Sequence, residues 1–131
     1  MNMSMITLED LSLAGNLLTG FEQSFDVLPW KNLRSLQLYS NKLQGSLPIP
    51  PPAIYEYEVS DNKLNGEIPE AISNLTSLSV LDLSINNLSG KLPQCLGIKS
   101  STATVLNLCS NSFSGDMLNF VCKEEKFVAE V

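Results

Sequence analysis

The 131-residue sequence contains no histidine and only three cysteines, Cys95, Cys109 and Cys122. Histidine is the commonest general base and metal ligand, so its absence removes the usual starting point for an acid–base or metal site. The cysteines lack the C-x-x-C spacing of a metal site, and no serine lies in a nucleophile-elbow sequence. We therefore expect a protein that is not an enzyme and that uses no metal and no cofactor.

Basic residues are also scarce. The sequence has eight Lys and Arg and fourteen Asp and Glu, which gives a net charge of -6. A nucleic-acid-binding surface needs clustered positive charge, so we expect no nucleic acid partner. No run of eighteen apolar residues occurs, so we expect no membrane-spanning helix in this chain. The N-terminus has no basic segment, and Glu9 and Asp10 interrupt its apolar residues, so we expect no signal peptide.

An asparagine recurs in a constant setting. Apolar residues lie five and three positions before it, Leu or Phe lies two positions after it, and Gly lies four positions after it. The five asparagines, spaced by 25, 21, 24 and 25 residues, are Asn16, Asn41, Asn62, Asn86 and Asn111. Five matches in register indicate a repeat protein.

Each part of the repeat has a physical role. The two apolar residues belong to a very short strand, since alternate side chains of a strand point to one face. The chain then bends, and the asparagine amide can donate to and accept from backbone groups of its own coil and of the neighbouring coil. One coil cannot bury its own apolar face, so the coils must stack. The five asparagines are therefore expected to form a structural column.

The segments "SDNKLNGEIPEAISNLTSLSVLDLSINNLSGKLPQCLG" and "VLPWKNLRSLQLYSNKLQGSLPIPPPAI" resemble the plant-type leucine-rich repeat, L-x-x-L-x-L-x-x-N-x-L-x-G-x-I-P. Together they resemble the ectodomain of plant leucine-rich-repeat receptor-like proteins. The resemblance implies an α/β right-handed leucine-rich-repeat solenoid of about five repeats. Short parallel strands would line its concave face, and loops, 3₁₀ turns or short helices would form its convex face. It also implies a place at the plasma membrane, on the extracellular side.

We expect the repeat array to cover residues 1–118, with degenerate first and last coils, and residues 119–131 to form a non-repeat tail that is frayed or weakly helical. Without capping units, the apolar pairs Leu11 with Leu13 and Leu106 with Leu108 should each be open on one side. In coil two, Pro50 to Pro52 favour an extended segment. We interpret it as a tight convex loop, and the alternative is a ligand for a proline-binding domain.

The resemblance implies a ligand-recognition module for a protein or peptide, with a co-receptor as a further partner and a role in defence or development. Two alternatives stay open. One is a secreted inhibitor of cell-wall-degrading enzymes, and the other is a truncated gene product without its own function. Acidic residues on two adjacent coils suggest a basic ligand, because such a ligand relieves their repulsion. The expected concave contacts are Ser35, Gln37, Tyr39, Glu56, Glu58, Asp61, Asp82, Ser84, Ile85 and Asn107.

Two sequons place expected glycosylation sites at Asn74 and Asn87 in a secreted protein. Asn74 should lie on the convex side, and Asn87 should lie just outside the asparagine column. The odd number of cysteines leaves at least one thiol unpaired within a monomer. Cys95 and Cys122 could pair between adjacent coils, and three free thiols are the alternative.

Overall fold

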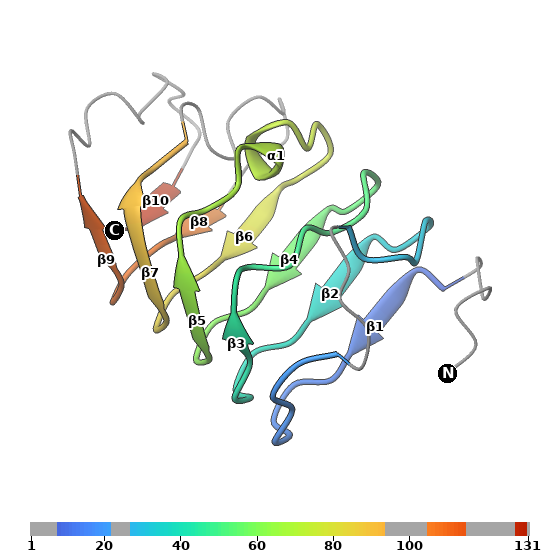
Figure 1. Cartoon of the computed structure of the whole chain (residues 1–131). Coiled ribbons are helices and arrows are strands. Elements are labelled where there is room, and N and C mark those ends of the chain that lie inside the picture. Colours follow the sequence, from blue (N-terminus) through green and yellow to red (C-terminus); the bar gives the residue numbers. More distant parts are fainter. Residues whose placement is uncertain (1–7, 22–26, 94–104, 115–127, 131) are drawn as a thin grey trace.

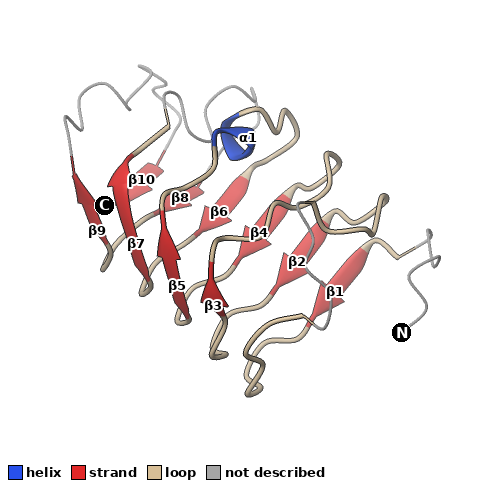
Figure 2. Ribbon diagram, viewed as in Figure 1, coloured by secondary structure: helices blue, strands red, loops and turns tan. Residues whose placement is uncertain are grey.

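In the computed structural model, residues 8–21, 27–93, 105–114 and 128–130 are described. Two rows of short parallel strands run along the molecule, joined in each coil by a turn (Figures 1 and 2). The first row is a six-stranded sheet in the order β1-β2-β4-β6-β8-β10. Its strands are β1 (Asp10–Ser12), β2 (Ser35–Gln37), β4 (Glu56–Glu58), β6 (Val80–Asp82), β8 (Val105–Asn107) and β10 (Val128–Glu130). The structure is therefore the parallel solenoid that the repeat predicts.

The register of this sheet follows the sequence repeat. Leu11 lies opposite Leu36, Leu36 lies opposite Tyr57, and Tyr57 lies opposite Leu81. Equivalent residues of successive coils thus form rows across the strands. The middle residue of β2, β4, β6 and β8 points into the core, and its two neighbours point to the other face. We call that other face, which carries six of the ten expected concave contacts, the open face.

A second sheet, which the sequence interpretation missed, follows the asparagines. It has the order β3-β5-β7-β9, with β3 at Gln44–Gly45, β5 at Lys63–Gly66, β7 at Asn87–Lys91 and β9 at Ser112–Ser114. Its leucines at 64 and 88 point into the core and its polar residues point outward. The repeat's glycines in this sheet, Gly45, Gly66 and Gly90, have positive φ. The N-x-L-x-G part of the repeat is therefore a second short strand as well as a turn.

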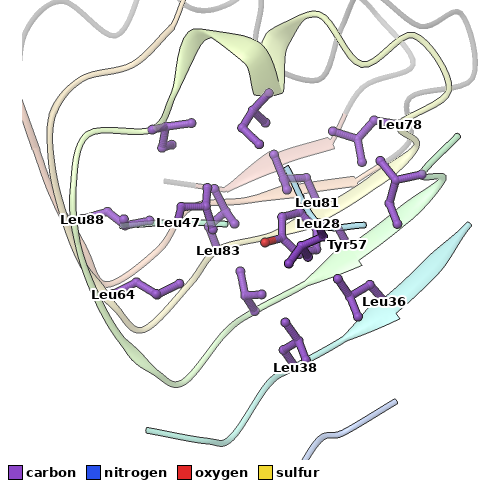
Figure 3. Packing of buried hydrophobic residues seen from close by; sticks show 14 of the residues in the cluster. Leu28, Leu36, Leu38, Leu47, Tyr57, Leu64, Leu78, Leu81, Leu83 and Leu88 are labelled. Atoms are coloured by element: carbon purple, nitrogen blue, oxygen red, sulfur yellow. The ribbon is translucent and has the colours of Figure 1, made fainter. Parts of the chain in front are cut away.

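The core fills the space inside the coils, and leucines from successive coils stack in it (Figure 3). Leu36, Leu38, Leu83 and Leu88 are completely buried. Burying a leucine side chain stabilises a fold by about 1.5–3 kcal/mol, so each repeat contributes mainly through its leucines.

The chain leaves the first sheet through a left-handed residue just before each described asparagine from Asn16 to Asn111. This position is Gly15, Ser40, Asp61, Ile85 or Ser110, with φ between 53° and 71°. Glycine and small polar residues tolerate this conformation, whereas a β-branched residue is strained in it. Ile85 is therefore the exception in the row.

The return segments on the far side of the coils differ between repeats. In coil three, Pro69 precedes α1 (Glu70–Ser73), which buries Ile72 and is followed by Asn74. The proline-rich return of coil two makes no helix, and Pro50 and Pro51 are buried in it. This burial favours the tight-loop interpretation over a segment offered to a proline-binding domain.

Two expectations about the C-terminal end are wrong. Residues Val128–Glu130 form β10, which pairs in parallel with β8, so this part of the tail is neither frayed nor helical. Leu106 and Leu108 are both buried and not open on one side. At the other end, Leu11 and Leu13 are only partly buried.

Cys95 and Cys122 lie outside the described residues, and Cys109 is a partly buried free thiol. The boundary expected at residue 118 also falls outside them. Among the described residues there is no helix with the length and apolar character needed to span a bilayer.

Candidate functional site

The asparagine column joins each coil to the one before it. The Asn86 side-chain amide donates to the carbonyls of Leu83 and Ser84 in its own coil and of Val59 in the preceding coil, at 3.0–3.2 Å. Its Oδ1 accepts the backbone N–H of Leu64 at 3.1 Å. Asn41, Asn62 and Asn111 repeat this pattern. The column satisfies backbone groups that the bend would otherwise leave unpaired.

Asn16 is exposed and differs from the rest of the column. Its amide donates only within its own coil, to the carbonyls of Leu13 and Ala14. The described residues supply no coil before it, so the bonds to a preceding coil are not made. Asn16 therefore holds its own turn and does not link two coils.

Six of the ten expected ligand contacts lie on the open face, in two rows. Ser35 and Glu56 lie in one row, while Gln37, Glu58, Asp82 and Asn107 lie in the other. All six side chains are partly buried. Their carboxylates gather on β4 and β6, which are adjacent strands (Figure 1).

Among these carboxylates, that of Glu58 has the fewest groups near it that would stabilise its negative charge. Burial raises the pKa of the Glu58 carboxyl above its ordinary value, and the charges of Glu56 and Asp82 raise it further. Glu56 accepts hydrogen bonds from Ser35 and Gln37, at 3.0 and 3.4 Å. No described side chain donates a hydrogen bond or forms an ion pair with the Glu58 carboxylate.

Asp82 contributes negative charge to the open face and also forms hydrogen bonds that hold the local backbone. Its Oδ1 accepts the Ser84 backbone N–H at 3.0 Å and the Ser84 hydroxyl at 2.6 Å. Asn107 accepts the N–H of Cys109 in the same way. These bonds hold the end of each strand and fix the direction of both side chains across the open face.

The other four expected contacts lie beyond the strands, in the turn between the two sheets, which we call the turn ridge. Tyr39, Asp61 and Ile85 are exposed there. Ser84 is only 6% exposed and its hydroxyl is bonded to Asp82, so the expectation that it offers its side chain to a ligand is wrong. The expected contacts therefore lie on two surfaces and not on one. These are the acidic open face and the turn ridge, where the apolar side chains of Tyr39 and Ile85 are exposed.

A cavity of about 300 Å³ lies at the start of strands β1, β2 and β4. It is lined by Glu9, Asp10, Arg34, Ser35, Tyr55 and Glu56. The Arg34 guanidinium lies 6.0 Å from the centre of the Tyr55 ring, in a cation–π contact. Sequence reasoning missed Glu9, Arg34 and Tyr55, although each lies seven positions before its asparagine.

Both expected glycosylation sites are exposed. Asn74 ends α1 on the return side, and Asn87 is the first residue of β7. Among the described residues, no group of three or more His, Cys, Asp or Glu could hold a metal ion.

The sequence pattern of the Leucine Rich Repeat family matches residues 32–53, 58–75 and 77–97. The chain belongs to the leucine-rich-repeat family. It is 44% identical over 92 residues to Receptor-like protein 7 of Arabidopsis thaliana and 41% identical over 102 residues to Receptor-like protein 6 of the same plant. The two alignments cover 70% and 78% of this chain, but only 9% and 10% of those relatives. The leucine-rich-repeat segment thus spans about a tenth of their length.

Solved leucine-rich-repeat ectodomains share the fold. The plant peptide hormone receptor RGFR1 in complex with RGF2 superposes with a TM-score of 0.72 at 30% identity, covering 86% of this chain and 18% of that one. The Arabidopsis receptor kinase HAESA, in complex with the peptide hormone IDA and the co-receptor SERK1, gives 0.67 at 28% identity, covering 98% and 26%. Pollen Receptor Kinase 3 gives 0.79 at 23% identity, covering 94% and 60%, which shows the fold alone.

Proposed function

We propose that the chain is a ligand-recognition module of a plant cell-surface receptor-like protein, and that its open face binds a protein or peptide. Its similarity to Arabidopsis receptor-like proteins supports the cell-surface setting, on the extracellular side of the plasma membrane. Its similarity to two receptors that hold peptide hormones supports a peptide-sized ligand. The signalling role would lie in defence or development, and a co-receptor would join the parent protein.

The observation that carries the proposal is the uncompensated carboxylate of Glu58 between Glu56 and Asp82. Like charges on paired strands repel, and this arrangement makes the free open face less stable than a neutral one. A basic residue of a ligand would remove that cost by pairing with Glu58. The same negative field would speed the approach of a basic ligand at low salt.

Association kinetics would test the proposal, with fluorescent dodecapeptides of net charge +3 as probes and peptides of net charge -3 for comparison. The variant combines Glu58→Gln with Asp82→Asn, because an amide oxygen at 82 can still accept the two Ser84 bonds. The matched control combines Glu67→Gln with Glu70→Gln, which removes the same charge from exposed residues elsewhere.

We expect the basic peptides to bind, with an association rate that falls as salt rises. The open-face variant should associate more slowly and show a flatter salt dependence, while the control should behave like the parent chain. Equal rates for all three proteins, or binding of the acidic peptides alone, would rule out a basic ligand on the open face.

The exposed sequons support N-linked glycans in the secretory pathway. Asn87 lies on the second sheet, away from the strands of the open face, so a glycan there leaves the proposed ligand surface free. Asn74 lies beyond the end of α1, on the return side of coil three.

A further inference from the structure

The cavity at the start of β1, β2 and β4 contains an arginine and a tyrosine, which the described strands of the open face lack. These are three consecutive strands of the first sheet (Figure 1). Glu9, Arg34 and Tyr55 each come directly before one of them, so they form a row across the coils that is about 10 Å long. The cavity volume of about 300 Å³ is at the lower end for ligand pockets, which suits a small ligand.

The backbone fixes this row of residues. The N–H groups of Arg34 and Ser35 both donate to the carbonyl of Glu9, at 2.7 and 3.0 Å. The N–H groups of Tyr55 and Glu56 both donate to the carbonyl of Arg34, also at 2.7 and 3.0 Å. The side chains of the row therefore start from fixed positions, and a ligand would not have to order this part of the chain.

The Arg34 guanidinium has its donors available to a ligand. It lies over the Tyr55 ring and forms no ion pair with any residue that the structure describes, although Glu9, Asp10 and Glu56 line the same cavity. A guanidinium carries only donors, in a planar fork, and can give two parallel hydrogen bonds to neighbouring oxygen atoms.

The carboxylates place acceptors beside these donors. Glu56 is held in position, because the Ser35 hydroxyl and the Gln37 amide donate to it at 3.0 and 3.4 Å. Glu9 and Asp10 are exposed, and neither carboxylate accepts a hydrogen bond from a described residue. Three carboxylates against one guanidinium also make the cavity negative, which disfavours an anionic ligand.

Tyr55 adds an aromatic surface to the cavity. Its side chain is 43% exposed, even though the Arg34 guanidinium lies over the ring. The face of a tyrosine ring is apolar, whereas its hydroxyl can donate and accept. The ring can therefore cover the C–H groups of a ligand whose polar groups bond to the residues around it.

We propose that this cavity binds a neutral carbohydrate, the end of an oligosaccharide chain. A sugar hydroxyl both donates and accepts, so it can bond to the arginine, which only donates, and to the carboxylates, which only accept. Neighbouring hydroxyl oxygens fit the paired donors of Arg34, and the C–H face of the sugar ring packs on Tyr55. This inference goes beyond the proposed function, because it requires neither a peptide nor Glu58.

Titration of the isotope-labelled full chain, followed by amide NMR, tests the site. Free cellotetraose, xylotetraose and mannotetraose are the neutral probes, the N-glycan core pentasaccharide represents protein-linked sugar, and tetragalacturonate is the anionic comparison. The variants are Arg34→Gln and Tyr55→Leu. Their matched controls are Lys63→Gln and Tyr39→Leu, at exposed residues that do not line the cavity. Thermal melting confirms that each variant is folded.

We expect at least one neutral probe to bind, with the largest amide shifts at the residues that line the cavity. Binding should not weaken as salt rises, because the ligand carries no charge. Arg34→Gln and Tyr55→Leu should each weaken binding about ten-fold, while both controls bind like the parent chain. A preference for the free tetrasaccharides or for the N-glycan core supports the inference and identifies the source of the sugar.

Three results would overturn the carbohydrate site. They are no binding of any neutral probe, binding of tetragalacturonate alone, and equal binding by the cavity variants and their controls. None of them changes the expected association of basic peptides with the open face, so the proposed function would stand. Loss of peptide binding would likewise leave the carbohydrate site standing.

Discussion

The phenol of Tyr57 in β4 donates a hydrogen bond of 2.6 Å to the backbone carbonyl of Pro48 in the preceding coil. Tyr57 takes the place that Leu36 and Leu81 hold in their coils, and it is completely buried (Figure 3). Burial raises its pKa well above the ordinary value, so the hydroxyl stays a donor. The larger side chain thus satisfies a carbonyl of the shortened, proline-rich return.

Replacing Tyr57 with Phe should lower the free energy of unfolding by about 1–3 kcal/mol, because the Pro48 carbonyl then lies without a donor. Urea denaturation measures the change, and Tyr39→Phe is the matched control. Tyr39 is 39% exposed, so its hydroxyl can bond to water, and the control should change stability by less than about 0.5 kcal/mol. Equal losses at both positions would contradict a structural role for the Tyr57–Pro48 bond.

The column and the first row of strands follow from the sequence, since both depend on what single side chains do locally. An asparagine among leucines needs backbone partners, and alternation around a leucine gives one buried face. The pairing of Val128–Glu130 with β8 depends on distant contacts, and the sequence has no local signal for it.

The site was harder to predict than the fold. The strand residues of the open face follow from alternation, whereas the turn ridge depends on a left-handed residue that Ile85 gives no reason to expect. The sequence interpretation places a bend at the asparagine and no strand after it, although the polar–Leu–polar–Gly run of KLNG alternates as a strand does.

The asparagine column provides a second test of stability. Asn86→Leu removes the bonds to both coils and leaves buried backbone groups unpaired, so we expect a loss of about 1–3 kcal/mol in the free energy of unfolding despite the added apolar surface. Asn87→Leu, one residue later and exposed, should be far milder. Asn16→Leu should fall between them, since Asn16 bonds only within its own coil. Equal effects at 86 and 87 would contradict the column.

Ile85 offers a change that should stabilise the chain. Its φ of 53° is strained for a β-branched residue, and its side chain is 55% exposed. Asn tolerates this conformation, so Ile85→Asn should raise the free energy of unfolding by about 1 kcal/mol. The reverse change, Ser110→Ile at the equivalent position of the next coil, should lower it by a similar amount. A loss of stability in Ile85→Asn would show that contacts of the isoleucine outweigh the strain.

The pH dependence of stability follows from Glu58. Because its pKa is higher in the folded chain than in the unfolded chain, the folded chain holds the proton to a higher pH. Stability therefore falls as the pH rises from the unfolded pKa of Glu, about 4.3, through the raised folded pKa. Below this window the carboxyl is neutral in both states and the cost is absent.

Glu58→Gln should therefore unfold at a higher urea concentration than the parent chain at pH 7.5, and the difference should shrink toward zero as the pH falls to about 4. Glutamine has no charge to bury beside Glu56 and Asp82, so its stability lacks this component of the pH dependence. Urea midpoints at half-unit steps of pH give the two curves. Glu67→Gln, which removes one charge from an exposed residue, controls for the general effect of net charge. If the Glu58→Gln and parent curves stay parallel over the whole range, Glu58 is not the carboxylate that the folded chain disfavours.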